Sequence, residues 1–452
     1  MIAEFPLYTM VPEAGKPAST ITFVFDPYRC PYRHTVDQLA GSCNMQAILK
    51  MQNPIQPYAW GSRTAIADLL GRPAPSDHPQ AELWMGAHPK APSDVFLQDG
   101  THRLDALIRQ DPTAFIGAPV RDRFGSRLPF LFKVLAVARP LSIQAHPSQA
   151  AAREGFAREN AAGISLNAPD RNYRDDQHKP ECVCALTPFD ALCGFRSPKA
   201  MLELLAPVWP ASQKDHLDRL HHREAGEAIQ AFFGALMQMP PQPCRDLLAH
   251  IVNRVASRPA GDAAYRWLLR LSNAYPGDVG ILAPLLLNFI RLSPGEALFL
   301  PAGRLHAYLD GVAIEVMANS DNVLRGGLTP KHMDAGELLR VLDFNPQRAA
   351  VLSAQPVSDT EKIYITQAEE FRLCVLHPTF DRPHIAERTA IGPEILLCTN
   401  GHATLHWQGR QQIVIRKGES IYITPTLNRY EIHGSATLYK AGVNMKTRRR
   451  AS

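Results

Sequence analysis

An almost unbroken apolar run is the clearest structural signal in the chain. Residues 128–138 read Leu-Pro-Phe-Leu-Phe-Lys-Val-Leu-Ala-Val-Ala, and their bulky, partly β-branched side chains predict a buried strand. After a turn, residues 141–146 alternate between apolar and polar, so that Ser142, Gln144 and His146 share one face of a strand. We expect this polar face to line a cavity and the opposite, apolar face to pack on a core.

A second strand-like stretch carries a carboxylate with a cation beside it. The stretch begins at Glu181, and Lys179 lies two residues earlier, on the same predicted face. Residues 295–303, Gly-Glu-Ala-Leu-Phe-Leu-Pro-Ala-Gly, predict another strand followed by a turn, and His306 comes directly after it. Three separate strand-like segments therefore carry side chains that can bind a metal.

Gln144, His146, Glu181 and His306 together form a mixed set of nitrogen and oxygen ligands. Such a set favours Zn²⁺ with an open position for water or substrate, although Mn²⁺, Fe²⁺ or Co²⁺ would also fit. We therefore expect one zinc ion per chain. A single histidine among the 17 of this sequence would carry little weight, so the inference depends on the spacing of the whole set.

Helical periodicity replaces the strand pattern between residues 197 and 280. Ser197-Pro198 is typical of a helix start, because a serine can cap the first turn and proline suits its first position. Apolar residues then recur at helical spacing, at Ile229, Phe232, Phe233, Leu236, Leu247, Leu248, Ile251, Val252 and Val255. Strand patterns resume near Phe289, so residues 197–280 are predicted to form a helical insert.

A short internal echo predicts that the β structure is duplicated. Residues 291–300 resemble residues 416–423, and each copy reads as strand, turn and strand. Two copies indicate two antiparallel barrels of the jelly-roll (cupin) kind. The second copy has Arg429 or Tyr430 where the first has His306, so we expect no metal there.

The predicted fold is therefore mainly β with an α-helical insert, as two jelly-roll (cupin) barrels plus a helical domain. The expected parts are a poorly packed N-terminal extension (1–44), a metal-binding cupin domain in two pieces (45–196 and 281–345), the helical insert (197–280), a C-terminal cupin-like barrel (346–445) and a basic tail (446–452).

Six segments resemble, in order, the motifs of type I mannose-6-phosphate isomerases, a family known as phosphomannose isomerases. They are residues 58–62 (YAWGS), 82–89 (ELWMGAHP), 141–147 (LSIQAHP), 178–181 (HKPE), 298–308 (LFLPAGRLHAY) and 320–331 (SDNVLRGGLTPK). The resemblance implies that Gln144, His146, Glu181 and His306 bind zinc. It implies reversible isomerisation of D-mannose 6-phosphate to D-fructose 6-phosphate through a cis-enediol(ate), which feeds GDP-mannose and glycan synthesis or mannose catabolism.

The resemblance also assigns residues around the metal. It makes Arg325 catalytic and places Ser142, Lys179, Asp321 and Lys331 in the substrate pocket, and we expect Lys179 to take part in catalysis as well. The general base stays open at this point, because metal-bound water, Lys179 and a carboxylate such as Asp321 or Glu315 are all admissible.

Five further residues of these motifs are expected to be structural. Buried packing is the usual role of large aromatic side chains, so Tyr58, Trp60 and Trp84 are placed outside the site. His88 and Asn322 are left out of the site for the same reason.

Composition indicates which broad classes of protein to exclude. A formal net charge of +5 over 452 residues, with the basic residues dispersed, does not predict nucleic-acid binding. The longest apolar run is too short to span a membrane, and the eight cysteines follow no disulfide framework. Alternation turns Cys182 and Cys184 away from the face of Glu181, so we expect both to pack in a core. A cytoplasmic, monomeric enzyme is expected.

Two other functions use a similar fold. A metal-dependent cupin oxygenase would share the ligand set but has no evident need for Lys179, Arg325 and Lys331. A non-enzymatic bicupin that binds sugar phosphates would keep these cations without needing an intact metal shell. Both fit the sequence less well than the isomerase.

Overall fold

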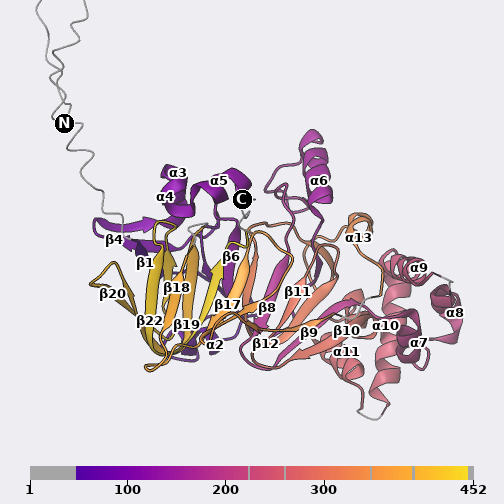
Figure 1. Cartoon of the computed structure of the whole chain (residues 1–452). Coiled ribbons are helices and arrows are strands. Elements are labelled where there is room, and N and C mark those ends of the chain that lie inside the picture. Colours follow the sequence, from indigo (N-terminus) through magenta and orange to yellow (C-terminus); the bar gives the residue numbers. More distant parts are fainter. Residues whose placement is uncertain (1–46, 222–223, 259–260, 347–348, 389–391, 446–452) are drawn as a thin grey trace, which may run out of the picture. The chain divides into compact units, whose positions relative to one another are not determined.

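Residues 47–221, 224–258, 261–346, 349–388 and 392–445 are described by the computed structural model of the chain, and the predicted terminal segments 1–44 and 446–452 lie outside them. The described part contains two large antiparallel sheets and a group of helices (Figure 1). The predicted fold class is confirmed: the chain is mainly β with a helical insertion. Each sheet has an open strand order, so the described residues form a cupin-like fold without a closed barrel.

The first sheet contains the segments that carry the predicted metal ligands. Its eleven strands are β2 (Ile55–Gln56), β3 (Glu82–Met85), β6 (Phe130–Val137), β7 (Ile143–Ala145), β8 (Glu181–Ala185), β9 (Phe189–Phe195), β10 (Leu287–Leu292), β11 (Glu296–Leu300), β12 (His306–Ala318), β13 (Leu324–Gly327) and β14 (Val351–Ser353). The long strand β12 joins the sheet together, because it pairs with β6 and β8 over its second half and with β7 and β9 over its first.

The second sheet is built mostly from the C-terminal part of the chain. Its strands are β1 (Ile48–Gln52), β4 (Asp94–Leu97), β5 (Gly100–Arg103), β15 (Gln355–Pro356), β16 (Glu361–Tyr364), β17 (Arg372–Leu376), β18 (His384–Glu387), β19 (Glu394–Trp407), β20 (Gln411–Arg416), β21 (Ser420–Ile423) and β22 (Arg429–Gly442). The internal echo falls on β10–β11 in the first sheet and β20–β21 in the second, and both are strand-turn-strand units.

Strands from the start of the described chain complete this second sheet. β1 pairs with β21, with Ile48 opposite Ile423, and β4 and β5 follow it at the sheet edge. The N-terminal region is therefore divided between the two sheets, whereas the sequence predicts that residues 45–196 belong wholly to the metal-binding domain. The difference arises because the alternation of side chains does not identify the partner of a strand.

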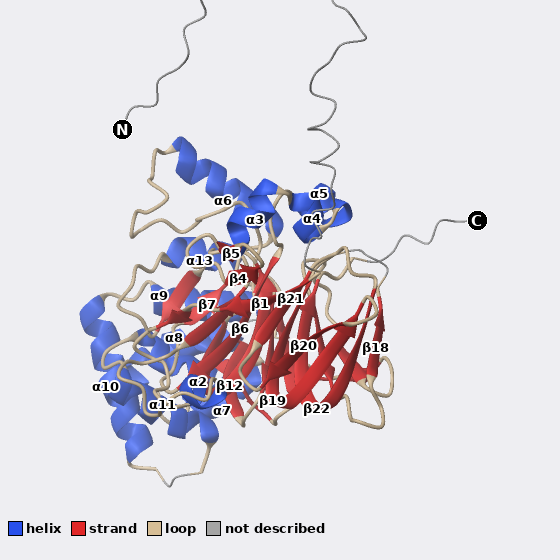
Figure 2. Cartoon of the chain, turned by 90° about the vertical axis from the view of Figure 1, so that its left-hand side faces the viewer, coloured by secondary structure: helices blue, strands red, loops and turns tan. Residues whose placement is uncertain are grey.

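Helices occupy one long insertion and several short connections. The connections contain α2 (Ala65–Leu69), α3 (Leu104–Gln110), α4 (Pro112–Ile116), α5 (Ala118–Phe124), α6 (Gln149–Ala161) and α13 (Ala335–Val341). The insertion contains α7 (Pro198–Leu205), η1 (Ala211–Gln213), α8 (Lys214–Asp218), η2 (Arg219–His221), α9 (Ala225–Met237), α10 (Pro241–Ala256), α11 (Ala263–Ala274), η3 (Val279–Leu282) and α12 (Ala283–Leu286). Figure 2 shows α10 and α11 gathered beside the strands of the first sheet.

The insertion begins as its sequence predicts and supports the strand that carries Gln144. The hydroxyl of Ser197 accepts a hydrogen bond from the backbone amide of Ala200 and caps α7. The apolar stripes of α9 and α10 enter a core that also contains Ile143 and Ala145, on the back of β7. The polar residue between them, Gln144, faces the opposite way and lines a cavity, as the alternation predicts.

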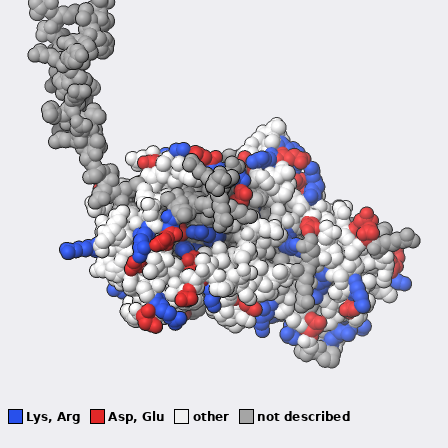
Figure 3. All heavy atoms as spheres, in the orientation of Figure 1, with Lys and Arg blue, Asp and Glu red and all other residues white. Residues whose placement is uncertain are grey.

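The surface offers few clues to function. On the face drawn in Figure 3, acidic and basic side chains are interspersed, and no extended patch of one sign is visible. Among the described residues, no helix combines the length and apolar character needed to cross a membrane. The six described cysteines are free, and Cys184 lies with its Sγ 3.1 Å from the hydroxyl of Tyr364, between the sheets rather than in the cavity.

Candidate active site

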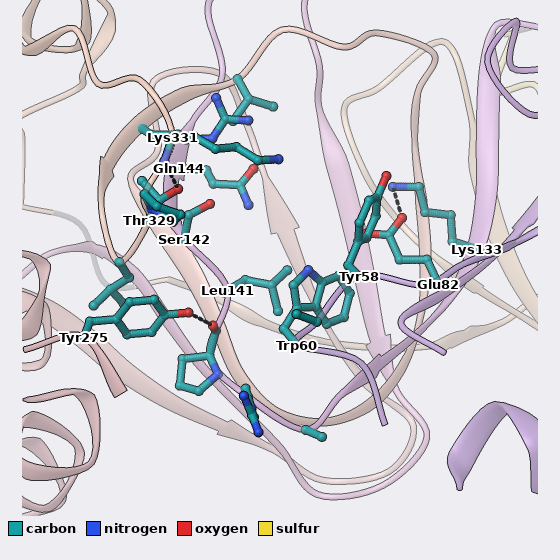
Figure 4. A pocket seen from close by; sticks show the side chains of 18 of the residues that line it. Tyr58, Trp60, Glu82, Lys133, Leu141, Ser142, Gln144, Tyr275, Thr329 and Lys331 are labelled. Atoms are coloured by element: carbon teal, nitrogen blue, oxygen red, sulfur yellow. Dashed lines mark hydrogen bonds and ion pairs between the residues drawn. The ribbon is translucent and has the colours of Figure 1, made fainter. Parts of the chain in front are cut away.

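A cavity of about 1010 Å³ opens beside the first sheet and contains most of the predicted site residues. Its volume is at the upper end of the roughly 300–1,000 Å³ that is typical of small-molecule sites. Figure 4 shows Ser142, Gln144 and Lys331 on one side of the cavity, facing Trp60 and Lys133 on the other. Three further residues of the predicted set line it: Lys179, Asp321 and Arg325.

His146, Glu181 and His306 meet at the ends of three strands. Their ligand atoms all lie within 4.8 Å of one another, and all three residues are buried. Nε2 of His146 is 3.1 Å from Oε1 of Glu181, and Nε2 of His306 is 3.5 Å from Oε2 of the same carboxylate. Gln144 is the direct neighbour of His306 in the pairing of β7 with β12. The four predicted ligands are therefore brought together from distant parts of the chain.

The two imidazoles are oriented as metal ligands require. Nδ1 of His146 is 2.8 Å from the carbonyl oxygen of Asn322, and Nδ1 of His306 is 2.9 Å from that of Arg304. Donation to these carbonyls places the proton on Nδ1 and leaves each Nε2 free to bind a metal. Burial, and then the charge of Lys179, lower the pKa of His146 to about 4, so its ring is neutral at pH 7. The residues present thus fit a divalent metal such as zinc.

Lys179 and Glu181 lie on one face, as their spacing predicts. Nζ of Lys179 is 2.9 Å from Oε1 of Glu181, and both side chains are buried. Burial by itself would raise the pKa of Glu181, but Lys179 and His146 hold it well below its ordinary value. The carboxylate is therefore ionised and available to a metal, with an ammonium group directly beside it.

A buried network of charges extends from Glu181 into the first sheet. Nζ of Lys133 lies 3.3 Å from Glu82 and 3.1 Å from Glu315, and the hydroxyl of Tyr308 lies 3.3 Å from Glu315 and 3.4 Å from Glu181. Burial would lower the pKa of Lys133, but these carboxylates raise it, so the lysine stays charged. The network reaches Glu181 through the hydroxyl of Tyr308 and helps to fix the position of its carboxylate. Lys133 was missed in the sequence because a single lysine inside an apolar strand has no periodic signal.

Arg325 and Lys331 form a basic region of the cavity wall. Burial and then neighbouring cations lower the pKa of both groups: Arg174 acts on Arg325, and Arg325, Lys90 and Arg174 act on Lys331. Neither Arg325 nor Lys331 forms an ion pair with a carboxylate in the described parts of the chain. Positive charges held together without counter-charges are suited to binding a phosphate group.

Asp321 is held by two basic side chains on the cavity wall. Its carboxylate lies 2.9 Å from Nζ of Lys90 and 3.5 Å from Nε2 of His88. Burial alone would raise its pKa, but His88 and Lys90 lower it far below the usual range. Asp321 is consequently a weak proton acceptor.

Asn322 is structural, as expected, and it holds the loop that leads to Lys179. Its side-chain oxygen accepts a hydrogen bond from the backbone amide of Arg174 at 2.7 Å. Its amide group donates to the carbonyl oxygens of Asp175 and Gln177 at 2.8 and 2.9 Å. Because its own carbonyl also accepts from His146, this one residue connects the loop to a predicted metal ligand.

The turn between Arg325 and Lys331 depends on a glycine. Gly327 has φ of +134°, and a Cβ there would lie 2.7 Å from Cα of Gly280 in the insertion. The carboxylate of Asp278 accepts hydrogen bonds from the amides of Leu328 and Gly280 and holds the two segments together. Gly327 therefore permits a close backbone turn that a residue with a side chain would obstruct.

Two family models match the chain. The model described as "Phosphomannose isomerase type I, catalytic domain" matches residues 48–198, and "Phosphomannose isomerase type I, helical insertion domain" matches residues 210–287. The chain is 42% identical over 392 residues to mannose-6-phosphate isomerase from Escherichia coli, covering 86% of this chain and 98% of that protein. This chain belongs to the type I phosphomannose isomerase family.

Other members of the family agree. Mannose-6-phosphate isomerase from Homo sapiens is 37% identical over 336 residues, covering 69% of this chain and 77% of that protein. A crystal structure of a mutant phosphomannose isomerase from Salmonella typhimurium superposes with a TM-score of 0.83 at 38% identity, covering 88% of this chain and all of that one. A zinc-bound crystal structure of mannose 6-phosphate isomerase gives a TM-score of 0.82 at 38% identity, with the same coverage.

The structure corrects the expectation for the aromatic residues in the phosphomannose isomerase motifs. Tyr58 is 40% exposed and Trp60 is half-buried, and both line the cavity with their rings stacked at 6.0 Å. Trp84 is buried as expected, but it also borders the cavity and donates to Glu82. His88 lines the cavity too. Large aromatic side chains are usually packed in a core, so the residue types alone predicted packing. The tertiary structure instead places these side chains along the wall of the cavity.

Proposed function

We propose that this protein is a zinc-dependent mannose-6-phosphate isomerase that interconverts D-mannose 6-phosphate and D-fructose 6-phosphate, with one zinc ion per chain. The observation that carries the proposal is the buried His146, Glu181 and His306 cluster beside a cavity with uncompensated cations. Membership of the phosphomannose isomerase family supports the same substrate. The product would connect hexose phosphates to GDP-mannose and glycan synthesis or to mannose catabolism.

Gln144, His146, Glu181 and His306 would hold the zinc ion. When bound, zinc polarises oxygen atoms of the substrate and stabilises negative charge that develops on them. The buried network of Lys133 and its carboxylate partners keeps Glu181 in place. The aromatic side chains of Tyr58 and Trp60 form the facing wall and would exclude water from the sugar.

The reaction requires a proton to leave C2 of the aldose and to be returned to C1, through a cis-enediol(ate). Of the side chains considered as general base, Asp321 is held by His88 and Lys90, and Glu315 is paired with Lys133 inside the sheet. Lys179 borders the cavity, and its ammonium group, 2.9 Å from Glu181, is placed to donate a proton to a substrate oxygen rather than to accept the proton of C2. A water molecule on the metal is then the remaining candidate for the base.

The phosphate group would be bound by Lys331, with Arg325 between the phosphate and the reacting carbons. Arg325 is opposite Gln144 in the pairing of β13 with β7, so its backbone lies beside a residue that would bind the metal. A guanidinium at this position can donate to an enediolate oxygen as negative charge develops there. Ser142, on the same face as Gln144, would bind a sugar hydroxyl.

A coupled assay for fructose 6-phosphate formed from mannose 6-phosphate tests the proposal. Activity is measured before and after dialysis against a chelator, and the zinc content is determined on the same samples. We expect activity to disappear with the metal and to return with added Zn²⁺. A folded, zinc-loaded protein that leaves mannose 6-phosphate unchanged would contradict the proposal, and oxygen consumption by that protein would favour the cupin oxygenase.

A further inference from the structure

The end of the helical insertion is hydrogen-bonded to the two segments that carry the proposed substrate-binding residues. The hydroxyl of Tyr275, directly after α11, donates to the carbonyl oxygen of Pro140 at 2.8 Å, in the segment that leads into β7 (Figure 4). Three residues later, the carboxylate of Asp278 accepts hydrogen bonds from the segment that follows β13. The insertion therefore reaches the cavity wall at two points, although none of the predicted metal ligands belongs to it.

The carboxylate of Asp278 is bound by backbone amides. Its Oδ1 accepts hydrogen bonds from Gly280 at 2.7 Å and from Leu328 at 2.9 Å, and its Oδ2 accepts one from Thr329 at 3.2 Å. Hydrogen bonds to an ionised carboxylate are roughly twice as strong as bonds between neutral groups. Two of the three amides belong to the turn that leads from β13 to Lys331, so Asp278 fixes the backbone of this turn.

The turn has a backbone conformation that few residues adopt. Leu328 has φ of +55°, in the left-handed region where the Cβ of an ordinary residue is crowded, and it follows Gly327 with φ of +134°. The side chain of Leu328 is 2% exposed and packs in the core that the insertion shares with β7. Such a conformation persists only where surrounding contacts fix it. Here those contacts come from the insertion, through its apolar core and through Asp278.

A chain of hydrogen bonds leads from Asp278 to Lys331. The amide of Thr329 donates to Asp278, and the hydroxyl of Thr329 accepts a hydrogen bond from the amide of Lys331 at 3.1 Å (Figure 4). Thr329 and Lys331 both line the cavity, whereas Asp278 does not. The place of Lys331 in the cavity wall therefore depends on a residue that lies behind that wall.

We propose that Asp278 of the helical insertion is a positioning residue of the isomerase, which fixes the turn at Leu328 so that Lys331 meets the phosphate group of the substrate. The inference rests on the proposed function, because that function assigns the phosphate to Lys331. The phosphate takes no part in the bond changes, so Lys331 binds it equally in the ground state and the transition state. Displacement of Lys331 should therefore raise KM and leave kcat nearly unchanged.

Steady-state kinetics with mannose 6-phosphate, on zinc-loaded protein of measured metal content, test the proposal. Asp278→Ala removes all three acceptor contacts and should raise KM about tenfold, with kcat changed by less than about threefold. Asp278→Asn keeps the oxygen that accepts from Gly280 and Leu328, and should raise KM only about threefold. Asp262→Ala is the matched control, because Asp262 caps α11 of the same insertion by accepting from Ala264 at 2.7 Å and does not border the cavity.

Combination with Lys331→Gln separates positioning from a general loss of structure. If Asp278 acts through Lys331, Asp278→Ala should raise KM no further once Lys331 is replaced, whereas independent effects would multiply. The proposal is wrong if the two effects multiply, if folded Asp278→Ala keeps the wild-type KM, if its kcat falls as much as its kcat/KM, or if Asp262→Ala raises KM equally. Asp278→Asn takes the place of Asp278→Ala in the same comparison if the alanine variant does not fold.

Calorimetric titration with mannose 6-phosphate distinguishes failure of this inference from failure of the proposed function. A wild-type protein that binds mannose 6-phosphate through Lys331 without isomerising it would contradict only the proposed function, and the dissociation constant then replaces KM in the comparison. Binding that is weakened in Lys331→Gln but unchanged in Asp278→Ala would contradict only the role of Asp278. Absence of any binding that depends on Lys331 would contradict both.

Discussion

Asn322→Ala should lower the free energy of unfolding far more than its small change in size suggests. The side chain is completely buried, and its three shortest hydrogen bonds reach backbone groups of Arg174, Asp175 and Gln177. Each partner left without a hydrogen bond costs about 1–3 kcal/mol, and the lower value applies here because these residues are half-buried. The three together give a loss of about 3 kcal/mol.

The same substitution should weaken metal binding. The carbonyl of residue 322 orients His146, and the loop that Asn322 holds leads to Lys179 and Glu181. Loss of such outer contacts typically reduces metal affinity by about 10–100-fold. Alanine keeps the carbonyl itself, so we expect a value near tenfold, caused by movement of the loop.

Urea unfolding of the chelated proteins, followed by fluorescence, measures the stability without a contribution from bound metal. Competition with a chromophoric chelator measures the zinc affinity. Asn319→Ala is the matched control, because Asn319 donates a single hydrogen bond of 3.3 Å, to Leu128, and should cost no more than about 1 kcal/mol. If the two substitutions lower stability equally, the reasoning about Asn322 is wrong.

Three further predictions concern the cavity, a turn and the second sheet. Arg325→Ala should reduce kcat by about 10²–10³-fold with zinc content unchanged, and a folded but zinc-free variant would contradict the role of Arg325 as a donor to the substrate. Gly327→Ala should lower activity in the coupled assay, because the added Cβ would lie 2.7 Å from Cα of Gly280. Gly295→Ala is the control and should leave activity unchanged, because a Cβ there meets nothing within 4 Å. Equal activities of the two variants would rule out the steric argument. Since the pKa of Glu394 is depressed from 4.5 to about 2, its ionised form stabilises the fold above pH 4.5, and that contribution should be lost as the pH falls towards 2. Glu394→Gln should make the free energy of unfolding depend less on pH between 2 and 4.5. If the urea midpoints of the variant change with pH as steeply as those of the wild type, Glu394 is not the group responsible.

Much of the local structure could be predicted from the sequence, because it depends on contacts between neighbours in the chain. The apolar run at 128–138 became β6, and the alternation after it turned Gln144 towards the cavity with Ile143 and Ala145 in a core. The helical insertion began at its serine cap. The spacing of Lys179 and Glu181 placed them side by side. In each case the side-chain period of two or 3.6 residues was enough to decide which face a residue occupies.

Only the tertiary structure decided which distant segments meet. The strand at Ile48 could pair with many partners of the same alternation, and it joined the second sheet beside β21. Lys133 reads as a single charge in an apolar strand, and its role appears only when Glu82 and Glu315 lie against it. Tyr58 is a large aromatic residue of the kind usually packed in a core, but in the structure it lines the cavity. Burial and charge are properties of the surroundings, and those surroundings are assembled from residues far apart in the chain.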